Sequence, residues 1–351
     1  MKILYFSRGY TPHDHRFLSA ITEAGHEASF LRLSHGASET RPIPKGAREA
    51  SGELKDVIEE VKPDLIHAGP LPGPGYLAAK SGFQPLVLMS WGSDILWEAR
   101  HNFLTRRRVR FALERADAVI GDCDTVRHAA VELGVHPDRI VIFPWGVDLN
   151  QFNPKGGNGN LRVRLGWQNN FVILHVRSWE PLYDPLTIGR AFIRAARRDA
   201  SLRLLMPGDG SLASRLSRVF ERAGMLDRAH MPGQVSQDDL SNYYRAADVY
   251  ISASQSDGSS VSLMEALASG VPALVSDIPG NREWVTPGKQ GWWFPVKDEV
   301  ALTDFMLHAA VGKQQNEMRT QARQVAEARA DWNRNKQRLF QAYDLALEAA
   351  G

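Results

Sequence analysis

Two acidic residues and the turn between them are the part of the sequence best suited to chemistry. Asp257 lies in a Gly/Ser-rich turn and Glu265 follows it after seven residues, in the stretch SDGSSVSLMEALASG. The preceding run ADVYISAS predicts a buried strand, and VSLMEALA has helical spacing that ends at Gly270. Such a strand, turn and helix start would present free backbone N–H groups to an anion at the carboxyl edge of a parallel sheet.

The same stretch could hold both a sugar and a phosphate. One carboxylate could accept hydrogen bonds from sugar hydroxyls and the other from a ribose, while phosphates would lie on the amides of Ser260, Val261 and Ser262. The alternative is a capping Asp257 and a solvent-facing Glu265, which is the common role of such residues in a surface helix.

The spacing resembles the acid-x7-acid signature of the retaining, nucleotide-sugar-dependent glycosyltransferases of family four, in which the first acid is usually Glu. Here that acid is Asp257. The resemblance implies a GT-B fold of two Rossmann-like doubly wound parallel-sheet domains facing a cleft. It also implies that Asp257 holds the transferred sugar, that Glu265 holds the ribose, and that neither a metal ion nor a cofactor is needed.

Arg177 follows the apolar run NFVILH, which predicts a strand, so its charge would stand at a strand end. An arginine there could neutralise a diphosphate or could be a salt-bridge partner. Family members usually carry a lysine five residues further on, where this chain has Leu182, followed by Tyr183. Arg177 would then carry more of the charge, helped by the helix dipole at Val261.

The resemblance implies further contacts to the nucleotide. The tight turn at Gly208 would lie near the nucleotide, and the backbone from Gly233 to Val235 would pair with the base. Gly9, in the loop after the first strand, would face the phosphates. The residues expected to be catalytic are Arg177, Asp257 and Glu265, and those expected to bind the nucleotide sugar are Gly9, Arg177, Gly208, Gly233, Val235, Asp257, Gly258, Ser260, Val261, Ser262 and Glu265.

Two loops of the first half are candidates for the acceptor side. His13 and Asp14 lie in the loop RGYTPHDH, and Trp91 and Asp94 follow the strand PLVLMS. His13 and His15 could be read as a metal pair, but without a third ligand nearby such a pattern is more often that of a polar surface loop. Trp91 could stack on a sugar or simply pack in the interior.

The order of elements predicts two α/β domains. A strand, loop, helix and strand open the chain, and the polar run NQFNPKGGNGN near the middle reads as a linker. We expect an acceptor-binding domain over 1–152 with a helix over 333–351 crossing back onto it, and a nucleotide-sugar-binding domain over 153–332. The first loop contains only Gly9 where a dinucleotide site needs G-x-G-x-x-G, which argues against a dehydrogenase.

Composition excludes several other classes of protein. The chain has 351 residues, 43% of them hydrophobic, a formal net charge of +2 and one cysteine, Cys123. This argues against a nucleic-acid partner and against a disulfide scaffold. No run of about eighteen apolar residues and no signal peptide is present, so we expect a cytoplasmic protein. The basic segment Arg106–Arg110 is either a solvated face or a peripheral contact with anionic lipid.

The resulting hypothesis is a retaining transferase that moves a sugar from a nucleoside diphosphate to a glycan, a lipid-linked glycan or a small molecule. The alternative is a non-catalytic protein of the same fold that binds a nucleotide or a glycan. The two departures from the family pattern, at Asp257 and Leu182, are the support for that alternative. A glycosidase is a third reading, because it also uses paired acids, but these need not stand at a phosphate site.

Overall fold

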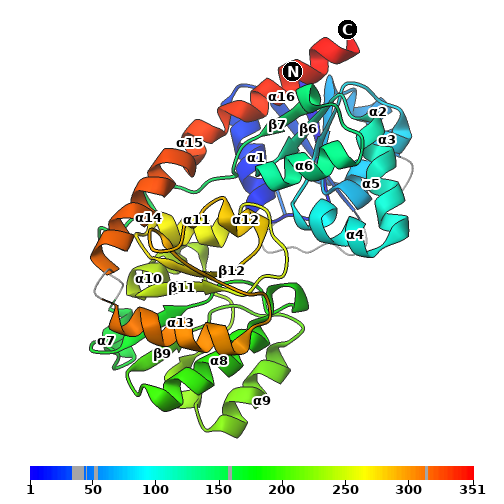
Figure 1. The fold of residues 1–351 in the computed structure, drawn as a ribbon. Coiled ribbons are helices and arrows are strands. Elements are labelled where there is room, and N and C mark those ends of the chain that lie inside the picture. Colours follow the sequence, from blue (N-terminus) through cyan, green and yellow to red (C-terminus); the bar gives the residue numbers. More distant parts are fainter. Residues whose placement is uncertain (34–42, 45, 51–53, 157–159, 313–314) are drawn as a thin grey trace. The chain divides into compact units, whose positions relative to one another are not determined.

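The computed structural model describes residues 1–33, 43–44, 46–50, 54–156, 160–312 and 315–351. Contacts between Cα atoms divide the chain into two compact units (Figure 1). Unit 1 comprises Met1–Pro144 and Arg334–Gly351, and unit 2 comprises Trp145–Asn333.

Unit 1 is built on a parallel sheet with the strand order β3-β2-β1-β4-β5-β6-β7. The order reverses at β1, which is the doubly wound arrangement expected from the sequence. Its strands are β1 (Lys2–Ser7), β2 (Glu27–Leu33), β3 (Arg48–Ala50), β4 (Leu65–Ala68), β5 (Leu86–Met89), β6 (Ala118–Gly121) and β7 (Ile140–Ile142).

Helices connect these strands and cover the sheet of unit 1. The helix α16 (Gln337–Ala350), at the end of the chain, packs against β5, β6 and β7 and lies beside the first elements of the chain (Figure 1). The other helical segments are α1 (Pro12–Glu23), α2 (Leu54–Val61), η1 (Leu71–Gly75), α3 (Tyr76–Ser81), η2 (Asp94–Glu98), α4 (Ala99–His101), α5 (Phe103–Arg115), α6 (Asp124–Glu132) and η3 (Pro137–Arg139).

Unit 2 repeats the doubly wound order in a second parallel sheet, β10-β9-β8-β11-β12-β13. The order reverses at β8, and the strands of this sheet are short and mostly apolar and buried, as parallel strands usually are. They are β8 (Phe171–Leu174), β9 (Leu202–Leu205), β10 (Ala229–His230), β11 (Val249–Ser252), β12 (Ala273–Ser276) and β13 (Gly291–Phe294).

Side chains of successive strand residues in unit 2 enter two separate cores, one on each face of the sheet. On β11, Val249 and Ile251 join a core with α8, α9 and α13, whereas Tyr250 joins a core with α10, α11 and α14. The helical segments are α7 (Leu161–Arg164), η4 (Pro181–Tyr183), α8 (Pro185–Arg198), α9 (Ala213–Ala223), η5 (Leu226–Arg228), α10 (Gln237–Ala246), α11 (Val261–Ala268), α12 (Pro279–Arg282), α13 (Glu299–Val311), α14 (Gln315–Arg329) and α15 (Trp332–Asn335), the last of which spans the division between the units.

The division between the units falls after Pro144, before the boundary at 152 expected from composition. The polar run that reads as a linker begins inside unit 2. Val147 forms a β-bridge with Asp331, and Phe152 is 1% exposed in the core beside α10 and α11. The polar run therefore lies close to the division between the units. The buried side chain of Phe152 nevertheless packs the first residues of this run into unit 2.

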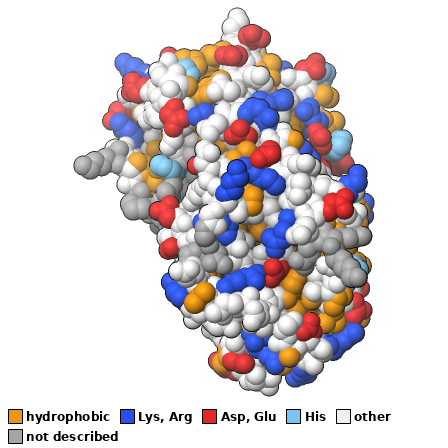
Figure 2. Space-filling view, turned by 90° about the vertical axis from the view of Figure 1, so that its left-hand side faces the viewer, with side chains coloured by type: hydrophobic (Ala, Val, Ile, Leu, Met, Phe, Trp, Pro, Cys, Tyr) orange, Lys and Arg blue, Asp and Glu red, His pale blue; other side chains and the backbone are white. Residues whose placement is uncertain are grey.

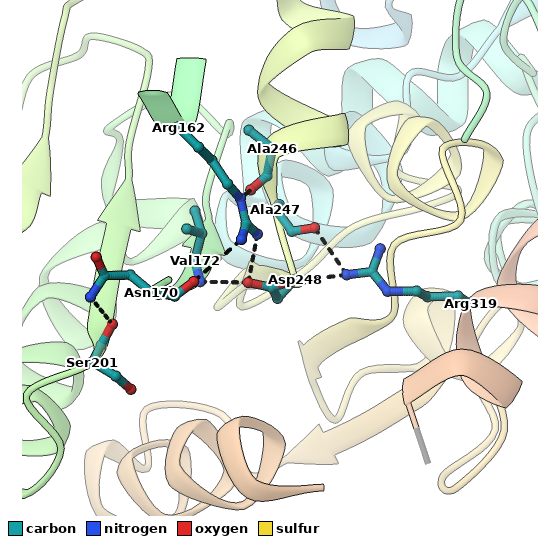
Figure 3. A network of polar contacts seen from close by, with 8 residues as sticks. All are labelled: Arg162, Asn170, Val172, Ser201, Ala246, Ala247, Asp248 and Arg319. Atoms are coloured by element: carbon teal, nitrogen blue, oxygen red, sulfur yellow. Dashed lines mark hydrogen bonds and ion pairs between the residues drawn. The ribbon is translucent and has the colours of Figure 1, made fainter. Parts of the chain in front are cut away.

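A network of charges organises the amino end of β11 (Figure 3). Asp248 accepts hydrogen bonds from Arg162 Nη2 at 2.6 Å, from the backbone N–H of Val172 at 2.8 Å and from Arg319 Nη2 at 3.1 Å. Arg162 belongs to α7 and Arg319 to α14, so one carboxylate ties two helices to the sheet. Asp248 directly precedes β11, so this network lies at the edge where the parallel strands begin. The opposite edge is the one where the strands end.

The surface shows mixed charge. On the face drawn in Figure 2, basic and acidic side chains are interspersed, as the net charge of +2 leads one to expect. Within the described residues, every helix is too short or too polar to cross a lipid bilayer.

Candidate active site

The carboxyl ends of β8 and β11 bring Arg177 and Asp257 together. The two strands are parallel neighbours inside the sheet of unit 2, with Val249 opposite Ile173. Arg177 follows β8 and Asp257 follows β11. Both side chains therefore lie at the edge of the sheet where α/β folds bind ligands.

Arg177 is the centre of a polar cluster. Its Nη2 lies 2.8 Å from Oδ2 of Asp257, and its Nη1 donates a hydrogen bond to Oγ of Ser260 at 3.0 Å. Its Cζ lies 4.1 Å from the centroid of the Tyr183 ring. The side chains of Arg177 and Asp257 are only 14% and 16% exposed. A cation, an anion and the cap of a helix thus share one largely desolvated site.

Two buried polar atoms of this cluster are open for a ligand. Within the part of the chain that the structure describes, Arg177 Nε and Asp257 Oδ2 have no hydrogen-bond partner. Asp257 Oδ2 meets the Arg177 guanidinium only as an ion pair, with Nη2 at 2.8 Å. Because buried polar groups nearly always find a partner in native proteins, such open atoms mark a place for a polar ligand.

Burial and the ion pair act on these charges in opposite directions. Burial raises the pKa of Asp257 above its ordinary value, and the charge of Arg177 and the N–H of Gly258 oppose that rise. Burial by itself lowers the pKa of Arg177, but the Asp257 carboxylate together with Tyr183, Tyr250 and Tyr244 raises that pKa above its ordinary value. The guanidinium therefore stays charged and can face an anionic ligand.

The start of α11 adds backbone donors to the site. Ser260 is its N-cap, and its Oγ accepts a hydrogen bond from the N–H of Leu263 at 3.4 Å. Ser262 Oγ lies 2.7 Å from the hydroxyl of Tyr250 and 3.1 Å from Ser260 Oγ. The first helical residue, Val261, is half-buried. The first turn of a helix has N–H groups without helical partners and the positive end of the dipole, which favour an anion.

A close backbone contact holds the turn that carries Asp257. A Cβ added to Gly280, on α12, would lie 2.5 Å from the carbonyl oxygens of both Asp257 and Gly258. Any side chain there would push the two segments apart, so glycine is required for this approach.

Glu265 lies further along α11 and is 4% exposed. Its Oε2 accepts a hydrogen bond from the hydroxyl of Tyr244 at 2.8 Å, and its Oε1 accepts one from Gln237 Nε2 at 3.3 Å. Both partners belong to α10, so this neighbouring helix orients the carboxylate. Glu265 is therefore not a solvent-facing residue of a surface helix, which was the alternative reading of the sequence.

The two glycine loops expected at the nucleotide lie side by side. The N–H of Gly208 donates to the carbonyl of Gly233 at 2.8 Å, and both glycines have positive φ, +141° and +82°. Val235, beyond the second glycine, is half-buried against the core of unit 2.

Two of the residues expected on the acceptor side are interior residues of unit 1. Asp94 is 1% exposed and accepts hydrogen bonds from Leu71 N, Ser90 Oγ, Trp91 N and Ile95 N. These bonds are made within unit 1, so its carboxylate organises the loop after β5 and does not face an acceptor.

Asp14 has a similar internal role at the start of α1. It is fully buried, it forms a capping box with Thr11, and it accepts a hydrogen bond from the Tyr5 hydroxyl at 3.2 Å. The spacing Thr11-x-x-Asp14 is the sequence signal for such a cap.

Three other residues expected near a ligand in unit 1 lie after β1 and β5. Gly9 is buried after β1. The rings of His13 and Trp91 are in edge contact, with centroids 5.4 Å apart, and both residues are partly exposed. His13 thus packs beside Trp91, and no group of three potential metal ligands occurs among the described residues.

Comparison with known families places this geometry in context. Residues 159–327 match the profile of the family described as "Glycosyl transferases group 1", and residues 9–151 match the one described as "Glycosyltransferase Family 4". The chain belongs to the family-four glycosyltransferases.

Curated relatives within this family share limited identity with the chain. A D-inositol 3-phosphate glycosyltransferase of Nocardia farcinica is 29% identical over 245 residues, which is 67% of this chain and 54% of that protein. A UDP-N-acetylglucosamine–peptide N-acetylglucosaminyltransferase subunit of Streptococcus gordonii is 34% identical over 146 residues, 39% of this chain and 28% of that protein. The chain spans about half the length, or less, of the curated relatives it matches.

Solved structures show the same fold over nearly the whole chain. HepE of Anabaena, in complex with UDP and glucose, has a TM-score of 0.83 and 18% identity, covering 98% of this chain and 99% of that one. Sucrose-phosphate synthase of Thermosynechococcus elongatus has a TM-score of 0.82 and 17% identity, with 100% of both chains covered.

Some residues of this candidate site were not found from the sequence. Tyr244 and Gln237, which hold Glu265, come from the helix before β11, and no local pattern links them to the acid. Tyr183 was noticed beside Leu182, but its contact with Arg177 depends on how η4 folds against the end of β8.

Proposed function

We propose that this chain moves a sugar from a nucleoside-diphosphate sugar to an acceptor hydroxyl, with retention of configuration at the anomeric carbon and without a metal ion. The observation that carries the proposal is the cluster of Arg177, Asp257 and Ser260 at the start of α11, with two buried polar atoms open. The complexes of HepE with UDP and with UDP-glucose support a nucleotide-sugar donor.

In this proposal each charged residue has a separate partner on the donor. Arg177 and the N-terminal amides of α11 stabilise the charge that develops on the diphosphate as it departs, and fixed donors of this kind need no reorganisation during the reaction. Asp257 accepts hydrogen bonds from hydroxyls of the transferred sugar. Glu265, held by α10, accepts from the ribose.

The transfer step then needs no nucleophile from the protein. The bond between the anomeric carbon and the diphosphate oxygen breaks, and its electron pair goes to the diphosphate. The acceptor oxygen bonds to the anomeric carbon on the same face, and its proton goes to the departing phosphate oxygen. The acceptor is a glycan, a lipid-linked glycan or a small molecule, and we propose that unit 1 binds it.

We also propose that α5 contacts anionic lipid head groups. Phe103 and Leu104 begin this helix with 70% and 65% of their surface exposed, and the exposed Arg106, Arg107 and Arg108 follow. Among the described residues these three arginines have no carboxylate partner. Exposed apolar side chains beside unpaired basic ones suit the interface of a negatively charged membrane. This group of five residues is called the α5 surface below.

The proposal is tested by calorimetric titration with UDP, GDP and ADP in the presence of EDTA, followed by transfer assays with the corresponding sugar nucleotides. We expect one diphosphate to bind the wild-type chain, and Arg177→Gln to weaken that binding by at least tenfold, since it removes a charge-assisted contact. Arg197→Gln, which changes an exposed arginine of α8, is the control and should bind like the wild type.

A different experimental result would contradict each part of the proposal. Absence of binding by all three diphosphates would overturn the donor assignment, and binding that appears only when magnesium or manganese is added would overturn the metal-independent one. Binding without sugar transfer to water or to any acceptor would favour the non-catalytic alternative. Inversion of the anomeric carbon in the product, seen by NMR, would overturn the retaining assignment.

A further inference from the structure

The structure gives Tyr183 a place in the site that the family resemblance does not. Its ring lies against the guanidinium of Arg177, with Arg177 Cζ 4.1 Å from the ring centroid. The residue before it, Leu182, stands where the resemblance leads one to expect a second cation. This chain therefore has an aromatic ring against the guanidinium of Arg177.

The backbone around Tyr183 is fixed from both sides. The N–H of Gln255, in the loop after β11, donates to the carbonyl of Leu182 at 2.8 Å, and Gln255 Nε2 donates to the carbonyl of Pro181 at 2.7 Å. Asp184 then adopts a left-handed conformation, with φ +43°, and caps the start of α8. The loop that carries Asp257 thus also holds the turn that carries Tyr183.

The Tyr183 ring contacts the guanidinium of Arg177 without occupying its N–H donors. Arg177 Nη1 donates to Ser260 Oγ, Nη2 faces Asp257, and Nε is buried without a partner among the described residues. Arginine binds phosphate through donors in this plane, so the orientation of the plane decides whether the donors reach it. Ser260, Asp257 and Tyr183 together define that plane.

We propose that Tyr183 is a positioning residue, which acts by holding the guanidinium plane of Arg177 toward the diphosphate of the donor. This inference rests on the proposed function. A long arginine side chain loses rotamer freedom when it binds, and a ring that already restricts it reduces that loss. With Leu182 in place of a second cation, the affinity for diphosphate depends more strongly on how well this one arginine is held.

The first test follows Arg177 in the ligand-free chain and does not depend on the reaction. NMR relaxation of the Arg177 Nε–H bond should show a rigid side chain in the wild type and in Tyr183→Phe, which keeps the ring. Tyr183→Leu fills similar space without a π face, and its Arg177 Nε–H should be clearly more mobile. Equal rigidity of Arg177 in Tyr183→Leu and in the wild type would overturn the inference, whatever the chain binds.

The second test measures binding of the nucleoside diphosphate that the wild type prefers, and of the matching nucleoside without phosphate. Tyr183→Leu should weaken diphosphate binding about five- to tenfold and Tyr183→Phe much less, consistent with a partly desolvated cation–π contact. Affinity for the nucleoside should stay the same, because it makes no contact with Arg177. A damaged fold would weaken both ligands, so the difference between them isolates the effect on Arg177.

The same binding measurement is repeated in two further variants of the chain, each with and without Tyr183→Leu. In Arg177→Gln, the additional change Tyr183→Leu should have no effect on diphosphate affinity, because the residue through which it acts is gone. In Leu182→Lys, which introduces a second cation, the loss caused by Tyr183→Leu should shrink. An equal loss in the Arg177→Gln background would overturn the inference. Absence of diphosphate binding in the wild type would overturn the proposed function instead, and the NMR test would still decide the role of Tyr183.

Discussion

At the scale of single residues, the contact between Arg177 and Asp257 means that the two ends of the donor are not bound independently. In the ligand-free site Nη2 of Arg177 faces the carboxylate at 2.8 Å. A diphosphate that approaches Arg177 therefore competes with Asp257 for the same cation. A sugar hydroxyl that donates to Asp257 would relieve that competition, so sugar and diphosphate would support each other's binding.

This leads to opposite expectations for two neutral substitutions. Glu265→Gln should weaken binding of the bare diphosphate about tenfold or more, because a charge-assisted hydrogen bond contributes about 1.5–3 kcal/mol. Asp257→Asn should leave that affinity unchanged or raise it, because it releases Arg177, but it should lower the transfer rate by removing a contact that orients the sugar. Calorimetric affinity and transfer rate, measured for both variants, check this.

A matched control for these variants is Asp248→Asn, the same chemical change at the other end of β11. It should lower stability by leaving Arg162 and Arg319 with a neutral partner, and the folded fraction should still bind diphosphate normally. Equal loss of diphosphate binding in Glu265→Gln and Asp257→Asn would mean that the roles of the two acids are assigned wrongly.

At the scale of elements, α5 shows how one helix can carry a structural and an interaction face. Val109, Ala112 and Leu113 pack into the core of unit 1. On its outer surface, the guanidinium of Arg107 lies 5.8 Å from the ring of Phe103, so the basic and apolar groups are adjacent. The core face explains why the helix folds without any membrane, and the outer face is free to bind one.

We expect the α5 surface to bind vesicles of phosphatidylcholine only when they contain phosphatidylglycerol. Each basic residue near such a surface contributes about 1 kcal/mol. The double variant Arg106→Ser/Arg107→Ser should therefore bind roughly thirtyfold more weakly in co-sedimentation, and added salt should weaken binding of the wild type. Phe103→Ser/Leu104→Ser should weaken binding through lost apolar burial, and this loss should depend less on salt.

A control with the same change in net charge is Arg197→Ser/Arg222→Ser, on exposed positions of α8 and α9 in unit 2. If it reduces vesicle binding as strongly as the α5 variant, the attraction comes from overall charge and not from the α5 surface.

At the scale of the whole molecule, each unit contains a fully buried histidine, in a strand of its sheet or directly after one. His67, on β4, contacts the hydroxyl of Tyr343 on α16 at 2.8 Å, and burial lowers its pKa to about 3. His175, after β8, contacts the carbonyl of Ile251 at 3.1 Å, and burial lowers its pKa to about 4. Both rings are therefore neutral in the folded chain at neutral pH.

These shifts predict a loss of stability in acid. The unfolded chain binds a proton at each histidine near pH 6.5, whereas the folded chain does not, so stability falls as pH decreases below that value. At pH 5 each histidine should cost about 2 kcal/mol relative to pH 7. Urea unfolding at the two pH values measures this free energy.

The contribution of one histidine is isolated by comparing the wild type with His67→Gln. Buried Asp14 and Asp94, whose pKa values burial raises, act in the opposite direction, and the comparison cancels them. Unit 1 of His67→Gln should lose about 2 kcal/mol less stability between pH 7 and pH 5 than the wild type. An equal loss of stability between pH 7 and pH 5 in His67→Gln and in the wild type would contradict the assignment.

The sequence by itself determined the two doubly wound units and most of the strand ends. Apolar runs such as NFVILH and ADVYIS are local signals, because strand burial and turn geometry depend on neighbouring residues. Two features of the site can likewise be read from neighbouring residues alone. They are the spacing between Asp257 and Glu265 and the position of Arg177 directly after a predicted strand. They were enough to predict a phosphate-type site at the edge of a parallel sheet.

Only the tertiary structure decided which polar residues face that site and which serve the interior. Asp94 resembled a ligand-binding residue from its place after β5, yet its hydrogen bonds reach back to Leu71 and across its own loop. The hydrogen bond from Tyr244 to Glu265 and the cation–π contact of Arg177 with Tyr183 join separate segments, which the folding of the sheet brings together. Strand order and helix packing decide which residues meet in these contacts. A short stretch of sequence does not predict them, because each contact depends on the positions of two separate elements.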